Sequence, residues 1–183
     1  MDLNTLRNSF NKVIIPKDNT LCLTESDGEA TLNKIEIYDV PPETFAVKID
    51  KFKLDNVFKT AGKWNYNKHG DYLIVTEKKL IFIEMKSAKK VEGSMSEQLR
   101  NKFLSDTCII SYFDSIFSNM LSKNSFFKDM ETLYIAFYRS PSIQKFPTNM
   151  VAQEPEHTSP EKYAKFGVHN EQKINFNRLC TKI

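Results

Sequence analysis

Glycine, cysteine and long hydrophobic runs are scarce in this sequence, and each absence excludes a class of protein. With only 5 glycines among 183 residues, the chain carries neither a GxGxxG nor a GxxxxGK phosphate-binding loop. The 3 cysteines, Cys22, Cys108 and Cys180, are far apart and form no CxxC pair. They therefore indicate reduced thiols and argue against a zinc site or a disulfide framework.

No apolar run approaches the roughly 20 residues that a membrane-spanning helix needs. The start of the chain, MDLNTLRNSFNK, lacks the apolar segment of a signal peptide. We therefore expect a soluble, cytoplasmic protein with no membrane partner. The formal net charge of +3 permits a polyanionic partner without indicating one. The length of 183 residues predicts a single domain over residues 1–183.

The stretch GDYLIVTEKKLIFIEMKSA, from Gly70 to Ala88, contains two apolar runs around a charged turn. The runs are Tyr72–Thr76 and Leu80–Met85, and both are rich in β-branched or aromatic residues. This pattern predicts a β-hairpin. Because each run is continuously apolar, it favours strands that are covered on both faces, as in the middle of an α/β sheet.

Other periodic segments flank this hairpin. Alternating apolar residues predict strands within 33–40 and 44–52, a further strand is expected over 131–140, and a helical spacing occurs over 2–14. An apolar residue every three to five positions predicts a long helix over 94–121, with Phe103, Cys108, Phe113 and Phe117 in the core. We expect loops over the polar segment 141–172 and a strand or short helix over 173–183. This order predicts an α/β fold with a mixed central β-sheet flanked by helices.

Charged residues stand at one end of the predicted hairpin. Asp71 opens the first strand, Glu84 closes the second, and Lys86 lies two residues later on the same face. Two neighbouring carboxylates repel each other unless a cation lies between them, and hard oxygen ligands suit Mg²⁺ or Mn²⁺. Such a metal can activate a water molecule, and a lysine beside it can position that water or offset negative charge.

The sequence provides its own control for this spacing. Glu-x-Lys occurs three times, starting at Glu77, Glu84 and Glu171. Only the pair at Glu84 ends an apolar strand whose hairpin partner begins with an acidic residue. The alternative interpretation is that Asp71 is a turn residue and that Glu84 and Lys86 form an exposed ion pair, which contributes little.

The segment GDYLIV…LIFIEMKSA resembles the PD-(D/E)xK nuclease superfamily, which has the restriction-endonuclease-like fold. The pattern of that family is an Asp at a strand start, a hairpin, (D/E)xK at the end of the next strand, and then a helix. Asp71, Glu84 and Lys86 match it residue by residue. The proline that often precedes the motif Asp is replaced by Gly70. The resemblance implies a nuclease-like core of about residues 45–140 with N- and C-terminal extensions.

The resemblance also implies an activity, namely metal-dependent hydrolysis of nucleic acid phosphodiester bonds, with DNA expected in preference to RNA. Asp71, Glu84 and the carbonyl of Met85 would bind Mg²⁺ or Mn²⁺, and Lys86 would act on the attacking water. Many members add a Gln or Glu from the next helix, where Gln98 lies beside Glu97, and some add an early acid, for which Asp50 is the candidate. A homodimer or a partner protein is expected, in phage defence or DNA processing. The alternative is a catalytically inactive nuclease-fold module that binds nucleic acid or a protein partner.

The remaining polar and aromatic residues have plainer interpretations. His69 is expected to be a solvated loop residue, and His157 and His169 lack the spacing of metal ligands. Lys89 and Lys90 follow the motif, where they could contact a phosphate backbone. Trp64 and Tyr66 alternate with Lys63 and Lys68, a pattern of a single-strand-binding loop and equally of an ordinary loop with a buried anchor.

Overall fold

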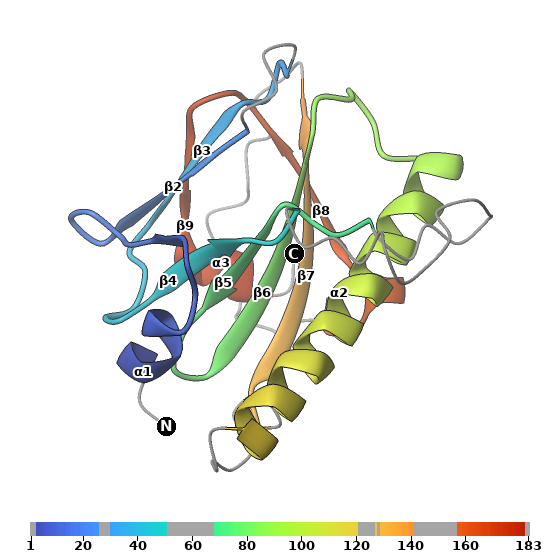
Figure 1. The fold of residues 1–183 in the computed structure, drawn as a ribbon. Coiled ribbons are helices and arrows are strands. Elements are labelled where there is room, and N and C mark those ends of the chain that lie inside the picture. The colour runs from blue at the N-terminus through green and yellow to red at the C-terminus, as the bar shows by residue number, and fades with distance from the viewer. Residues whose placement is uncertain are drawn as a thin grey trace.

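The structure is a computed structural model that describes residues 3–25, 30–50, 68–120, 127, 129–140 and 157–181. These residues form a mixed α/β protein with a six-stranded mixed sheet, a three-stranded sheet and one long helix (Figure 1). In chain order, the elements are α1 (Leu3–Asn8), β1 (Val13–Ile14), β2 (Thr20–Thr24), β3 (Lys34–Tyr38), β4 (Phe45–Lys48), β5 (Tyr72–Val75), β6 (Lys79–Lys86), α2 (Ser94–Met120), β7 (Glu131–Arg139), the 3₁₀ helix η1 (Pro160–Lys162), β8 (Ala164–Val168), β9 (Gln172–Asn175) and α3 (Phe176–Cys180).

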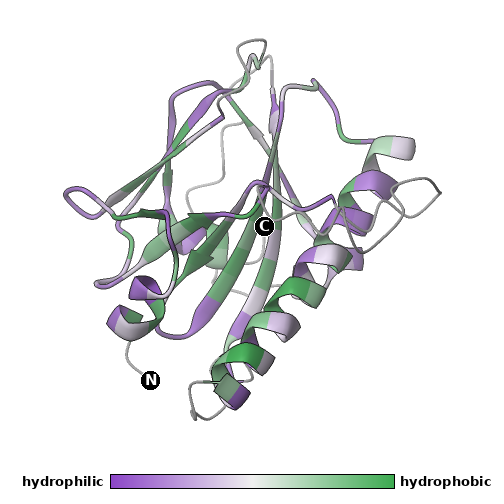
Figure 2. Cartoon of the chain, viewed as in Figure 1, coloured by the Kyte–Doolittle hydropathy of each residue, from purple (hydrophilic) through white to green (hydrophobic). Residues whose placement is uncertain are grey.

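The six-stranded sheet has the order β1-β4-β5-β6-β7-β8. The pairs from β1 to β6 are antiparallel, whereas β6, β7 and β8 run parallel to one another. Helix α2 connects β6 to β7, as the connection between parallel neighbours requires. The predicted hairpin is confirmed as β5 and β6, with Tyr72 opposite Ile83 and Val75 opposite Leu80. Figure 2 shows these strands as mainly apolar and the turn between them as polar.

One face of this sheet packs against α2 and α1. Leu73, Val75 and Phe82 of the hairpin lie in a cluster with the buried side of α2. Phe82 stacks on Tyr134 with ring centroids 5.4 Å apart, and Phe103 meets the same ring edge-on. The predicted core aromatics Phe103, Phe113 and Phe117 are buried here, because residues three, four and seven apart share one side of a helix.

The other face of the sheet is covered by the second sheet, which has the order β2-β3-β9, and by α3. The strands TLCLT and KIEIY each bury alternate residues, and these pack on Ile74, Ile81 and Ile83. Strand β3 pairs antiparallel with β2 and parallel with β9. The expectation that helices flank the central sheet therefore holds for one face, whereas a sheet and one short helix cover the other.

Most predicted elements are present, and the differences have physical reasons. The strands predicted within 33–40 and 44–52 and over 131–140 are confirmed as the shorter β3 and β4 and as β7, with residues 51–52 outside the described residues, and α2 spans 94–120. The helix expected over 2–14 ends at Asn8, and residues 13–14 join the sheet instead. The final segment contains a strand followed by a helix.

Two expectations about burial and loops are wrong. The segment AKFGV, expected to be a loop, forms β8 because Phe166 and Val168 are buried beside β7; residues 141–156 of that segment lie outside the described residues. Cys108 is exposed, since it lies five residues after Phe103 and hence on the other side of the helix. No helix in the described ranges is long and apolar enough to cross a membrane.

Candidate functional site

Asp71 and Glu84 lie on neighbouring strands at the same end of the hairpin. The Asp71 amide donates to the Ile83 carbonyl at 2.9 Å, which continues the ladder one residue beyond β5. The Met85 amide donates to Asp71 Oδ2 at 2.6 Å. Because Leu73 and Phe82 face α2 and side chains alternate along a strand, Asp71, Glu84 and Lys86 also face α2. The structure thus brings the three motif residues together.

Glu84 is fully buried and is held by two lysines. Its Oε1 forms ion pairs with Lys86, from its own strand, and with Lys102 of α2, whose Nζ lies 2.5 Å away. The second oxygen, Oε2, is buried without a hydrogen-bond partner. A buried carboxylate oxygen without a donor or cation is costly, so the site has capacity for one more positive or donating group.

The same environment changes the ionisation of its neighbours. Burial, and next the charge of Glu84, raises the pKa of Asp71 from 3.8 to about 7. Burial works to lower the pKa of Lys102, but the charges of Glu84 and Asp71 outweigh it and the pKa lies above its ordinary value. Lys102 therefore stays charged at neutral pH, while Asp71 holds a proton more readily than an ordinary aspartate.

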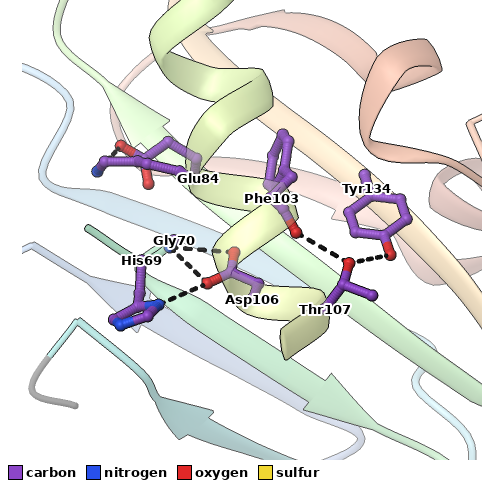
Figure 3. A network of polar contacts seen from close by, with 8 residues as sticks. His69, Gly70, Glu84, Phe103, Asp106, Thr107 and Tyr134 are labelled. Atoms are coloured by element: carbon purple, nitrogen blue, oxygen red, sulfur yellow. Dashed lines mark hydrogen bonds and ion pairs between the residues drawn. The ribbon is translucent and has the colours of Figure 1, made fainter. Parts of the chain in front are cut away.

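Three polar residues spaced by four lie on one side of α2, namely Gln98, Lys102 and Asp106. Their exposure decreases along the helix, from exposed Gln98 through part-buried Lys102 to fully buried Asp106. Both oxygens of Asp106 accept from the Gly70 amide, at 3.0 and 3.1 Å, and Oδ1 lies 3.4 Å from His69 Nδ1 (Figure 3). The helix thereby contacts both strands that carry the motif acids.

His69 is buried, which corrects the expectation of a solvated loop residue. Its side chain is enclosed next to Asp106, and neither ring nitrogen has a hydrogen-bond partner. The ring lies beside Asp106 in Figure 3, where a dashed line joins the two side chains. Burial raises the pKa of Asp106, against the opposing effects of His69 and Gly70. The carboxylate next to His69 belongs to Asp106 on the long helix, far along the chain. The sequence of the loop alone therefore gave no indication that His69 is buried.

Gly70 lies where a larger residue would crowd both α2 and the neighbouring strand β6. A Cβ atom at this position would lie 2.8 Å from Asp106 Oδ2 and 3.2 Å from the Ile83 carbonyl oxygen. Proline would in addition lack the amide hydrogen that Asp106 accepts. The close approach of α2 therefore favours glycine at position 70.

The other predicted residues lie farther from the centre of the site. Gln98 and Glu97 are exposed on the first turns of α2. Asp50 directly follows Ile49, whose amide donates to the Asp71 carbonyl at 3.0 Å, so it lies at the same end of the sheet. Lys68, Lys89 and Lys90 are exposed, and Lys63, Trp64 and Tyr66 lie outside the described residues. His157 is buried, with Nε2 2.8 Å from the Leu179 carbonyl oxygen, and His169 is half-buried.

Lys102 and Asp106 were not predicted from the sequence as residues of this site. A signal for Asp106 exists, because it lies seven residues after Leu99 and three after Phe103 and so falls on the apolar side of the helix. A carboxylate on that side needs a buried partner. Lys102 lies one turn before it, and both could have been assigned to the hairpin once the helix was oriented.

The donor set can be compared with the needs of a divalent cation. The described part of the chain holds no group of three or more His, Cys, Asp or Glu side chains that could bind a metal. Mg²⁺ needs fewer, since it keeps several waters and is commonly held by one or two carboxylates. Asp71, Oε2 of Glu84 and the Met85 carbonyl fit that requirement, and the unpartnered Oε2 supports it.

Comparison of the chain with protein-family models, with curated proteins and with solved structures found no match.

Proposed function

We propose that this protein is a metal-dependent nuclease with a restriction-endonuclease-like core, which hydrolyses phosphodiester bonds in nucleic acid, DNA in preference to RNA. The observation that carries the proposal is the buried pair Asp71 and Glu84, which faces two lysines and retains one carboxylate oxygen without a partner. The chain order β4-β5-β6-α2-β7 supports it, because the motif residues lie at the strand ends that this order brings together.

Each residue has a role that its position supports. Asp71, Glu84 and the Met85 carbonyl would hold Mg²⁺ or Mn²⁺, which would polarise a phosphoryl oxygen and lower the pKa of a bound water. Lys86 is part-exposed beside Glu84, where it can orient the attacking water and offset the charge that develops on phosphate. Gln98 lies at the exposed start of the same helix side and can contact that water or the substrate.

A second candidate is a catalytically inactive module of the same fold that binds nucleic acid or a protein partner. It is favoured by the ion pairs of Glu84, since two lysines already balance the two carboxylates without a metal. A thermal-shift titration with Mg²⁺ or Mn²⁺ separates the candidates, because only a functional carboxylate site gains stability by binding the ion.

The test of the proposed function is cleavage of plasmid, linear and single-stranded DNA and of RNA, with Mg²⁺ or Mn²⁺ and with a chelator. Metal-dependent cleavage is expected in the wild type, and Glu84→Ala or Lys86→Ala should reduce its rate by a factor of about 100 or more. Lys79→Ala is the matched control, because Lys79 pairs with Glu131 at the other end of β6. Cleavage that survives both active-site substitutions would remove this assignment.

The proposed function extends to the oligomeric state of the protein and to its biological role. We propose that the protein acts in the cytoplasm as a homodimer or with a partner protein, in phage defence or DNA processing, as the resemblance to the nuclease superfamily implies. Light scattering of the purified chain, alone and with a DNA duplex, tests for the dimer.

A further inference from the structure

The two oxygens of Glu84 have very different surroundings. Lys86 and Lys102 both pair with Oε1, whereas the buried Oε2 has no hydrogen-bond partner. An ion cluster that served stability alone would distribute its donors over both oxygens, because an unpartnered buried oxygen is costly. The arrangement therefore leaves one oxygen available for a further cation.

Lys102 is positioned more firmly than a surface lysine. It lies one turn before Asp106, which binds the Gly70 amide next to Asp71, so the helix backbone is tied to the hairpin. Its side chain is 18% exposed and lies 2.5 Å from Glu84. The ammonium is thus held beside the carboxylates at a fixed place.

We propose that Lys102 is a further active-site residue: it positions Glu84 by holding Oε1, leaves Oε2 for the metal, and competes electrostatically with the divalent cation for this carboxylate. The inference rests on the proposed function. An ammonium and a divalent cation that share one carboxylate lie within a few Å of each other and repel strongly in a buried site. Removal of the ammonium should therefore strengthen metal binding, an effect that a purely structural lysine would not produce.

The experiment is a titration of the full chain with Mn²⁺ at pH 8, in which the electron paramagnetic resonance signal of free Mn²⁺ reports binding. Lys102→Met should lower the dissociation constant by about tenfold or more, because one unit of positive charge is removed beside the ligand. Lys102→Arg, which keeps the charge, and Lys79→Met, which breaks the pair with Glu131, should remain within about twofold of the wild type. Glu84→Gln should abolish the binding.

Thermal unfolding of the same variants is measured in chelator and with Mn²⁺, in addition to the titration. Lys102→Met should unfold at a lower temperature than the wild type without metal and gain more from Mn²⁺. If this variant does not fold, Lys102→Gln replaces it in the same titration.

The outcomes distinguish the two proposals. If the wild type binds Mn²⁺ through Glu84 but neutral variants at position 102 bind it equally or more weakly, the inference about Lys102 is wrong and the proposed function stands. If the wild type shows no Mn²⁺ binding that depends on Glu84, the proposed function and the inference fall together.

Discussion

The charge of Asp71 depends strongly on its surroundings. Burial and the neighbouring Glu84 raise its pKa from 3.8 to about 7, so the folded protein without metal binds a proton there that the unfolded chain releases. Between the two pKa values, at a pH from about 4 to about 7, the folded state binds more protons at this group than the unfolded state does. The stability associated with this group is therefore full below about pH 4 and is lost as the pH rises to about 7.

The substitution Asp71→Asn tests this linkage. Asparagine imitates the protonated acid and can still accept from the Met85 amide, so the variant should be more stable than the wild type at pH 8 in chelator. A shift of about three pKa units corresponds to a gain of at most about 4 kcal/mol, which should disappear towards pH 4. Urea unfolding across this pH range measures it, with Asp129→Asn at an exposed aspartate as the control. A gain that is independent of pH would contradict the raised pKa.

Helix α2 is the element that links the two halves of the site. Lys102 binds Glu84 of β6, and Asp106 binds the Gly70 amide just before β5, so one helix side holds both strands in register. Thr107 adds a third contact, with its hydroxyl 2.9 Å from Tyr134 Oη on β7 (Figure 3). The helix therefore brings Lys102 against the two carboxylates that the β5–β6 ladder places side by side.

The close approach of α2 to Gly70 predicts the effect of two substitutions. Gly70→Ala should destabilise the protein by about 1–3 kcal/mol, because its Cβ would crowd both Asp106 and the Ile83 carbonyl. Asp106→Ala leaves the buried Gly70 amide without an acceptor and should cost about 1–3 kcal/mol. In the double variant the clash with Asp106 is absent. Urea unfolding should therefore show that the double variant is destabilised by less than the sum of the two single variants. Strict additivity would show that Gly70 and Asp106 are not coupled.

At the scale of elements, the sequence predicted the secondary structure that is set by local sequence patterns. The hairpin and the ends of α2 follow from apolar runs, turns and periodicity, and this placed Asp71, Glu84 and Lys86 together. Burial of His69 and strand β8 were not predicted, because each depends on an element that packs from elsewhere in the chain. The exposure of Cys108 could have been predicted from the helix period alone, since Cys108 lies five residues after Phe103. Residues 164–168 form a strand because β7 supplies a paired edge, which no local pattern reveals.

At the scale of the whole molecule, the second sheet supports the site from behind. The hydroxyl of Tyr72, the residue after Asp71, donates to the Thr24 carbonyl of β2 and accepts from the Thr24 amide at 3.0 Å. Ile35, Ile37 and Phe176 are buried in the cluster that this sheet shares with the hairpin. We therefore expect both sheets to unfold as one unit.

Phe176→Ala tests that cooperativity. It should cost about 3–5 kcal/mol, as large-to-small changes in a core do, and shift the whole transition. Far- and near-ultraviolet circular dichroism should give coincident curves, while Asn177→Ala at the exposed neighbour should change stability by less than about 0.5 kcal/mol. Separate transitions would show that the second sheet is an independent unit.

The parallel pairing of β3 with β9 has a consequence for folding kinetics. Residues near the two strands, such as Asn33 and Asn170, are 137 positions apart, so this contact closes a very long loop. Contacts of high sequence separation slow folding, and β3 presents an unpaired edge until β9 arrives. We therefore expect an intermediate in which the central sheet and α2 are formed, the β2–β3 hairpin lacks its third strand, and self-association is the competing reaction.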